Sequence, residues 1–222
     1  MIDKLNTLIT ISIDGLDGCG KTTQIEMLTK YLESKGIPYD VYQVSKELKQ
    51  ECYSYLRTDL IKDKNRTYGS FFLGQIRDYT KYIYEKLLDN PGNRVIIFDR
   101  WIYSTFLYHG YDLEIRDAVC KVYNSGDILI PKLQLFLNTV IKTCMDRVKK
   151  RENDDLKELG DEETLVRALF LHGSTRNQGY NIRNDIIDIN GNRTPEEIHQ
   201  EILELIQKVN VWQTKVDLIF IQ

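Results

Sequence analysis

A glycine-rich loop, set between an apolar run and a segment with helical spacing, limits the fold of this chain more than any other feature. The loop at residues 15–22 reads GLDGCGKT and matches the pattern G-x-x-x-x-G-K-[ST] at every fixed position. The β-branched run at residues 8–13 predicts a buried strand before the loop, and residues 22–34 predict an amphipathic helix after it. This order of strand, tight loop and helix is typical of parallel α/β sheets.

The residue types of the loop suit a phosphate group. Glycines allow backbone N–H groups to converge on an anion, and the N-terminus of the following helix adds partial positive charge. Lys21 is placed to reach the β- and γ-phosphates, and the Thr22 hydroxyl to complete the coordination of Mg²⁺. We therefore expect a nucleoside triphosphate here, bound through Gly15, Gly18, Cys19, Gly20, Lys21, Thr22 and Thr23.

The remainder of the chain alternates short apolar runs with segments of helical spacing, which predicts an α/β fold. Further strands are predicted at residues 38–44, 94–98, 133–137, 186–189 and 216–222. Further helices are predicted at residues 46–62, 70–88, 104–109, 114–124, 140–151, 163–171 and 195–209. We expect one domain over residues 1–222 with the three-layer P-loop NTPase fold, in which helices cover both faces of a sheet of about five mostly parallel strands.

The composition argues against nucleic acids and membranes as partners. The 30 basic and 33 acidic side chains leave a net charge of −3, so the 14 tyrosines fit a core and a substrate pocket better than a nucleic-acid surface. The four cysteines, at positions 19, 52, 120 and 144, lack metal-ligand spacing and fit a reducing compartment. No apolar run approaches the roughly 20 residues of a membrane helix, so we expect a soluble, cytoplasmic protein.

A second polar motif, FDRW, follows the predicted strand at residues 94–98. Asp99 and Arg100 should emerge at the carboxyl edge of the sheet, on the side where the glycine-rich loop lies. A carboxylate there binds Mg²⁺ through water or orients an attacking oxygen, and an arginine clamps a phosphate with two hydrogen bonds. The pair therefore indicates phosphoryl transfer between two phosphates.

Three segments, in this order and spacing, resemble the signature regions of thymidylate kinases. They are GLDGCGKTTQ, FDRWIYSTFLYHG and IPKLQLFLNTVIKTCMDRVKKR, and the resemblance extends from Thr10 to about Leu205. It implies transfer of the γ-phosphoryl group of ATP to a pyrimidine deoxynucleoside monophosphate, most simply dTMP to dTDP. It also implies Mg²⁺ at Thr22 and Asp99, small-molecule nucleotide substrates, and a homodimer formed through the helix at residues 70–88.

The same resemblance implies roles for single residues. Asp17, the acid inside the loop, would contact the deoxyribose 3′-hydroxyl and an arginine of the acceptor site. Lys21, Asp99 and Arg100 would be catalytic, and Arg100 would hold the acceptor phosphate. The acceptor nucleotide would bind through Asp17, Phe72, Arg77, Arg100, Ser104 and Tyr108, with Tyr108 placed to stack on the base.

The chain departs from the family pattern at several positions. Leu73 stands where the base-stacking aromatic is usual, so Phe72 is expected to substitute for it. Trp101 replaces the usual Tyr or His. The arginine expected after the second strand has no equivalent except Lys46 or Lys49.

A charged segment at about residues 149–162 has the composition of a lid. Thymidylate kinases with glycine at the position of Gly18 supply basic residues from the lid, which here implies Arg151 in preference to Lys149 or Lys150. Beyond the lid, His172 and Arg176 fit surface groups better than nucleotide ligands.

Two other functions remain open from the sequence. The weakened acceptor-phosphate set is compatible with a kinase acting on a deoxynucleoside or a modified nucleotide. A phosphate loop alone is also compatible with a non-catalytic nucleotide-binding regulator, although Asp99 and Arg100 argue against that reading.

Overall fold

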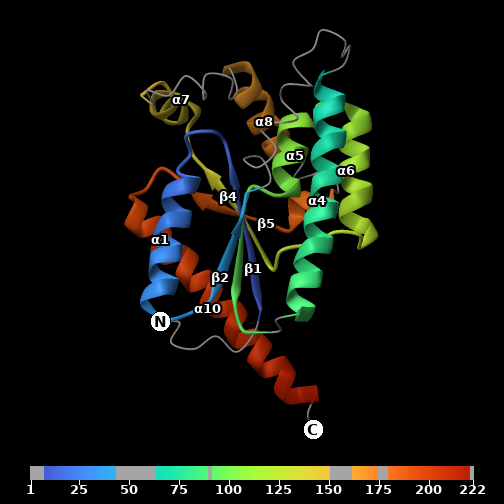
Figure 1. Cartoon of the computed structure of the whole chain (residues 1–222). Helices are drawn as coiled ribbons and strands as arrows, with labels where there is room; N and C mark the ends of the chain where they lie inside the picture. The colour runs from blue at the N-terminus through green and yellow to red at the C-terminus, as the bar shows by residue number, and fades with distance from the viewer. Residues whose placement is uncertain (1–7, 44–63, 90–91, 151–161, 175–179, 221–222) are drawn as a thin grey trace.

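A five-stranded parallel sheet forms the centre of the protein (Figure 1). The structure is a computed structural model that describes residues 8–43, 64–89, 92–150, 162–174 and 180–220. Its strands lie in the order β2-β3-β1-β4-β5, and each neighbouring pair is parallel. Their bounds are β1 Ile9–Gly15, β2 Tyr39–Tyr42, β3 Val95–Asp99, β4 Leu133–Asn138 and β5 Ile186–Asn190. The predicted α/β architecture is confirmed.

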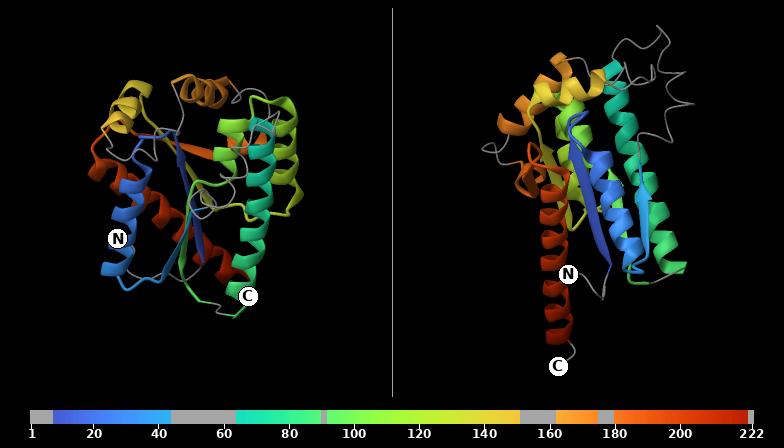
Figure 2. Two further views of the ribbon diagram at one scale, coloured as in Figure 1. Left: turned by 45° about the horizontal axis from the view of Figure 1, so that its top comes forward. Right: turned by 90° about the vertical axis from the view of Figure 1, so that its left-hand side faces the viewer.

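Helices cover both faces of the sheet, as Figures 1 and 2 show. On one side α1 packs against α10, and on the other α4, α5 and α6 pack together. Helices α7 and α8 lie over the end of the sheet where β1 leads into the glycine-rich loop. The helix bounds are α1 Lys21–Ser34, α4 Lys64–Asp89, α5 Ile102–His109, α6 Leu113–Ser125, α7 Ile141–Lys149, α8 Glu162–Ser174, α9 Asn181–Asn184 and α10 Pro195–Phe220.

Strand β1 is the central strand and brings the two polar motifs together. It lies between β3 and β4, and all seven of its residues are buried. Ile13 is in register with Asp99, so β3 ends two residues before the glycine-rich loop begins at Gly15. Because adjacent parallel strands end at the same edge of a sheet, the loops that follow β1 and β3 lie side by side.

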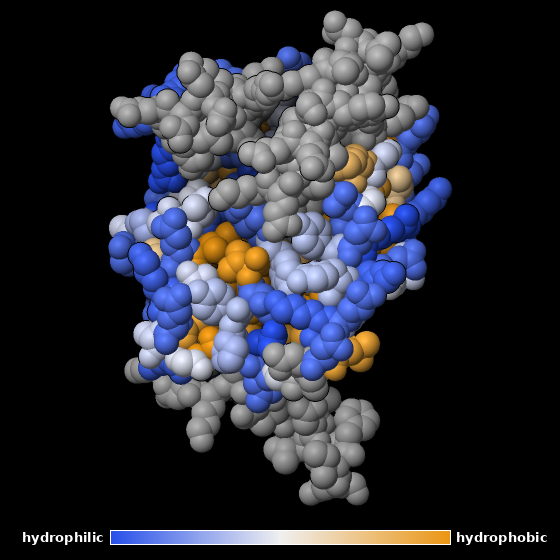
Figure 3. All heavy atoms as spheres, in the orientation of Figure 1, coloured by the Kyte–Doolittle hydropathy of each residue, from blue (hydrophilic) through white to orange (hydrophobic). Residues whose placement is uncertain are grey.

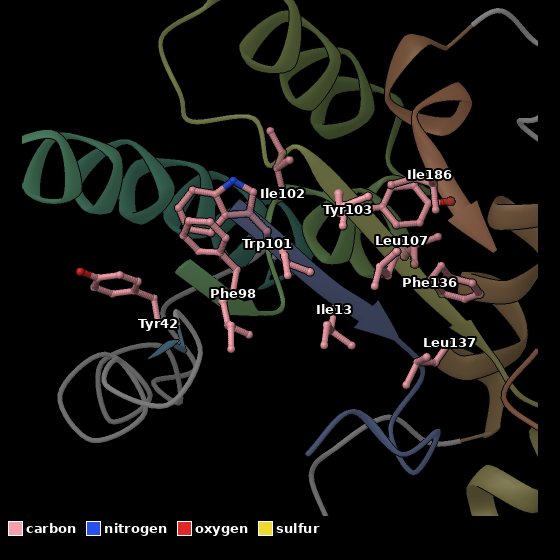
Figure 4. Packing of buried hydrophobic residues seen from close by; sticks show 14 of the residues in the cluster. Ile13, Tyr42, Phe98, Trp101, Ile102, Tyr103, Leu107, Phe136, Leu137 and Ile186 are labelled. Carbon is pink, nitrogen blue, oxygen red and sulfur yellow. The ribbon is translucent and has the colours of Figure 1, made fainter. Parts of the chain in front are cut away.

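The core next to these loops is aromatic, as Figure 4 shows. The rings of Phe98 and Trp101 lie 4.1 Å apart between centroids, and both side chains are buried. The Trp101 indole N–H donates to the backbone oxygen of Leu129 at 2.8 Å, which satisfies its polar atom. Burying a side chain of this size stabilises the fold by about 2–3 kcal/mol, so the chain just after Arg100 is firmly anchored.

One sequence prediction is wrong, because residues 216–220 are helical and not a strand. Helix α10 continues from Pro195 to Phe220. After Pro195 this stretch contains neither glycine nor proline, so nothing in the sequence ends the helix. A short apolar run has no period that separates a buried strand from a helix, which explains the error. The short helix α9 was not predicted, and the predicted helix at 46–62 lies outside the described residues.

The interpretation of His172 as a surface group is also wrong. His172 is only 3% exposed and stacks on Phe136 with ring centroids 3.9 Å apart. Its Nδ1 lies 2.7 Å from the Tyr103 hydroxyl, and its Nε2 lies 2.9 Å from Asp188 Oδ1. Buried Arg183 donates to the second oxygen of Asp188 at 2.8 Å, so the cluster ties α5, α8 and α9 to β5. Arg176 lies outside the described residues.

Burial opposes ionisation of Asp188, but the hydrogen bonds and charge of His172 and Arg183 outweigh it and hold the pKa of this carboxyl below its usual value. We predict that Asp188→Asn lowers the free energy of unfolding by about 2 kcal/mol at pH 7. A carboxyl whose pKa is lower in the folded state stabilises fully above its unfolded pKa of about 3.9. The difference between the proteins should therefore shrink as the pH falls below that value.

Urea unfolding of both proteins between pH 3 and pH 8 would measure this dependence. Asp117→Asn, on the exposed face of α6, is the control and should change stability by no more than about 0.5 kcal/mol. A cost for Asp188→Asn that is the same at every pH would contradict the assignment.

The surface fits the mixed charge of the sequence. The face seen in Figure 3 is mostly hydrophilic, with hydrophobic areas set between polar side chains. Within the described residues, no helix combines the length and apolar character needed to cross a membrane.

Candidate active site

The glycine-rich loop has the geometry of an anion site. Gly18 and Gly20 adopt φ angles of +82° and +108°, which favour glycine. A Cβ added at Gly18 would lie 2.2 Å from the backbone oxygen of Cys144 on α7, so only glycine fits there. Gly20 is the N-cap of α1, and neither a capping side chain nor an acidic residue occupies the first turn. The N–H groups and the positive end of the helix dipole therefore remain suited to a phosphate.

Lys21 lies folded into this loop and is 7% exposed. Its ammonium group donates to the backbone oxygens of Gly15 at 3.1 Å and Leu16 at 2.9 Å, and its Nζ lies 3.7 Å from Cys19 Sγ. Carbonyl oxygens are weaker partners for an ammonium group than phosphate oxygens, which carry charge. The loop thus holds the lysine where a triphosphate would exchange these contacts.

The turn after β3 is strained and closely tied to β1. Arg100 has a φ angle of +69°, and it is the single non-glycine residue with positive φ in the described part of the chain. Its backbone N–H donates a hydrogen bond to the backbone oxygen of Ile13 at 3.3 Å. A residue with a Cβ pays about 1–2 kcal/mol for this conformation. Strain at a polar residue next to an anion site indicates that the direction of its side chain matters.

The side chain of Arg100 reaches the glycine-rich loop. Its guanidinium group forms an ion pair with Asp17, and its Nη1 donates to the backbone oxygen of Gly15 at 3.3 Å. The guanidinium also lies over the ring of Tyr108, 5.4 Å from the centroid, and the Tyr108 hydroxyl accepts the Asp17 N–H at 3.1 Å. Burial disfavours the charged form of Arg100, but Asp17, together with Tyr108 and Asp99, outweighs this and raises the pKa of the guanidinium group.

The remaining residues predicted at the loop lie as follows. Thr22 and Thr23 are exposed in the first turn of α1, and Asp99 is 8% exposed at the end of β3. Ser104 points its hydroxyl to Asp14 at 2.5 Å. Arg151 lies outside the described residues.

The predicted base-binding residues fall into two groups. Phe72 on α4 stacks on His109 at the end of α5, with ring centroids 5.6 Å apart and planes at 29°. Tyr108, next to His109, contacts Arg100 through its ring. Arg77 instead faces Asp127, which precedes β4, at 3.6 Å and is half exposed. The structure thus brings Phe72 to α5, whereas the Arg77 guanidinium group contacts Asp127.

Sequence reasoning missed two residues that contact the site. Asp14, buried in β1, accepts hydrogen bonds from the start of α5. Its signal was the one charged residue of a buried strand, directly before the first glycine of the loop. Arg147, on α7, donates from Nη1 to the backbone oxygens of Gly18 at 3.2 Å and Cys19 at 3.5 Å. It comes four positions before Arg151 in the sequence, the residue that was predicted to act from the lid.

A parallel sheet with an anion loop after its central strand, a buried lysine in that loop and an arginine from the neighbouring strand define a P-loop phosphotransferase. A family model described as thymidylate kinase matches residues 13–202, which is most of the chain. The chain therefore belongs to the thymidylate kinase family, and it is a nucleoside monophosphate kinase. This confirms the resemblance inferred from the three sequence motifs.

Relatives in curated collections agree over nearly the whole length. Thymidylate kinase of Fervidobacterium nodosum is 29% identical over 200 residues, which cover 88% of this chain and 96% of that protein. Thymidylate kinase of Carboxydothermus hydrogenoformans is 29% identical over 214 residues, covering 90% and 97%. Thymidylate kinase of Thermoanaerobacter sp. is 26% identical over 209 residues, covering 89% and 97%.

The stacked pair of Phe72 and His109 gives a pH prediction. Burial lowers the pKa of His109 to about 4, whereas the unfolded value is about 6.5. Between these values the unfolded chain binds a proton that the folded chain does not, so stability falls as the pH drops from 6.5 to 4. We predict that this loss reaches about 3 kcal/mol and that His109→Gln removes it.

Denaturant unfolding of both proteins from pH 4 to pH 8 measures the effect. At pH 8 the histidine is neutral in both states, so the comparison there reports the cost of the substitution alone. An unchanged pH dependence in His109→Gln would show that this imidazole is not shielded from protons.

Proposed function

We propose that this chain transfers the γ-phosphoryl group of ATP to dTMP through the cations gathered at Gly15, yielding ADP and dTDP. One observation carries the assignment of roles: Lys21 and Arg100 both donate to the same backbone oxygen, that of Gly15, at 3.1 and 3.3 Å. One cation comes from the donor loop and the other from the strand next to it. When an ATP phosphate and the dTMP phosphate replace this shared oxygen as partners of Lys21 and Arg100, the two phosphates lie next to each other.

The proposed exchange of partners follows from charge. Phosphate oxygens carry more negative charge than a carbonyl oxygen, so ATP draws Lys21 away from Gly15 and Leu16. The phosphate of dTMP draws Arg100 from Asp17 and binds it through two hydrogen bonds. Asp17 then accepts the deoxyribose 3′-hydroxyl, as the family resemblance implies.

The chemistry needs no covalent enzyme intermediate. An oxygen of the dTMP phosphate attacks the γ-phosphorus, the bond from that phosphorus to the bridging oxygen of ATP breaks, and ADP leaves. Lys21 and Arg100 neutralise charge on the transferring group, and the rigid strands hold the two phosphates in line. Positioning and charge neutralisation therefore account for the catalysis.

The oxygen donors near the loop fit Mg²⁺. This ion takes one or two protein oxygens together with substrate phosphates and water, so it requires no dense cluster of acids. We assign it to the hydroxyl of Thr22, in the first turn of α1, and to the carboxylate of Asp99, at the end of β3. When bound, Mg²⁺ would neutralise part of the triphosphate charge.

The lid, the assembly and the compartment belong to the same proposal. Arg151 supplies the cation of the lid. Arg147 stabilises the glycine-rich loop through its hydrogen bonds to the backbone oxygens of Gly18 and Cys19. Helix α4, which carries exposed Tyr82, Tyr84 and Leu88, forms a homodimer face. Free cysteines at positions 19, 120 and 144 among the described residues support a cytoplasmic, reducing setting.

We predict that Lys21→Ala lowers kcat at least 10²-fold, because it removes a preorganised cation from the transferring phosphoryl group. The control is Lys30→Ala, an exposed lysine on the same helix, which should keep full activity. ADP release measured with dTMP, dUMP, dCMP and thymidine gives the acceptor class, and dTMP should be the best substrate. Near-normal turnover of Lys21→Ala would refute the assigned roles, and preference for thymidine would refute a monophosphate acceptor.

A further inference from the structure

A buried carboxylate in β1 has no part in the mechanism described so far. Asp14 is 0% exposed and lies in the central strand, one residue before the glycine-rich loop. Taking an acid out of water is costly, and burial raises the pKa of its carboxyl. A group retained at such cost needs a specific partner.

The partner of Asp14 is the start of α5. Its Oδ1 accepts the backbone N–H groups of Trp101 at 3.1 Å and Ser104 at 3.1 Å, and the Ser104 hydroxyl at 2.5 Å. Trp101 is the N-cap of α5 and has no side-chain oxygen that accepts these bonds. Asp14 therefore caps α5 from a different strand, since free N–H groups at a helix start need acceptors.

This cap closes the strained turn that carries Arg100. Two hydrogen bonds to β1 hold the turn. The Arg100 N–H donates to the backbone oxygen of Ile13 at 3.3 Å, and the N–H of the next residue, Trp101, donates to Asp14 Oδ1 at 3.1 Å. Arg100 lies between these two attachments with its φ angle of +69°. Without the second attachment, the turn has less to offset its strain and relaxes toward a negative φ.

We propose that Asp14 is a positioning residue, which aims the Arg100 guanidinium at the acceptor phosphate by capping α5 from β1. Asp14 acts through the backbone of Trp101 and Ser104 and does not touch the substrate. Because Asp14 is followed at once by Gly15, one short segment of β1 sets both the donor loop and the direction of the acceptor arginine.

We assign this role to the hydrogen-bond acceptor at Oδ1. The second oxygen, Oδ2, is buried and makes no hydrogen bond within the described residues. Asparagine keeps the Oδ1 acceptor and nearly the same shape, whereas alanine removes it. Comparing the asparagine and alanine variants therefore distinguishes a hydrogen-bonding role of Asp14 from a role in packing alone.

The proposal rests on the proposed function, and the test compares Asp14→Ala and Asp14→Asn with Thr10→Val. Thr10 is the matched control, because its buried hydroxyl in the same strand accepts the Lys132 N–H at 2.9 Å, next to the opposite end of the sheet. For Asp14→Ala we expect kcat to fall about 10- to 100-fold and KM for dTMP to rise about 10-fold, with the Kd for ATP within about twofold of the parent value. Asp14→Asn should recover most of this activity.

Thr10→Val should lose stability as Asp14→Ala does and keep parental kinetics. Loss of activity in both variants in proportion to stability would overturn the proposal, as would parental kinetics in Asp14→Ala. If Asp14→Ala does not fold, Asp14→Ser, whose side chain is one atom too short to reach the Trp101 N–H, takes its place with the same expectations.

A readout that does not depend on turnover keeps the two proposals apart. With Trp212, the second tryptophan, replaced by phenylalanine, the emission of buried Trp101 reports the turn. A red shift in Asp14→Ala, absent from Asp14→Asn and Thr10→Val, supports the cap even if dTMP is not the acceptor. An unshifted emission in Asp14→Ala would overturn the cap, whatever the enzyme phosphorylates.

Discussion

The backbone oxygen of Gly15 is the point on which the rest of this site depends. It accepts hydrogen bonds from Lys21 and from Arg100, which belong to loops that follow adjacent parallel strands. Two cations on one neutral oxygen repel each other, and the Asp17 carboxylate compensates on the arginine side. This arrangement is poised for anions, because two phosphates satisfy the cations better than one carbonyl group does.

The sheet makes that convergence a property of the fold. Asp99, the last residue of β3, is in register with Ile13, two residues before β1 ends. Trp101 anchors the turn in an aromatic core, and Asp14 of the neighbouring strand accepts a hydrogen bond from the Trp101 N–H. At the far end of α5, Phe72 of α4 stacks on His109. The glycine-rich loop follows β1, Arg100 lies in the turn between β3 and α5, and the aromatic pair joins α4 to the end of α5.

Local patterns predicted the parts of the protein that local chemistry determines. The loop from Gly15 to Thr22, the buried strand before Asp99 and the parallel sheet followed from residue types and spacing. The extension of α10 did not, because an apolar run at 216–222 suits a strand or a helix equally well and only the absence of a breaking residue favours the helix. His172 was misjudged because its partners, Tyr103 and Asp188, come from other elements. Asp14 was missed for the same reason: a carboxylate is read as a helix cap only when the two strands are known to be neighbours.

The most direct test of the shared-oxygen arrangement is a crystal structure of the protein with ADP, Mg²⁺ and dTMP. We predict that the Lys21 ammonium group leaves Gly15 for the β-phosphate, while the Arg100 guanidinium leaves Asp17 and binds the phosphate of dTMP from a turn whose φ angle is still positive. A complex in which Arg100 stays paired with Asp17 while another group holds the dTMP phosphate would contradict it.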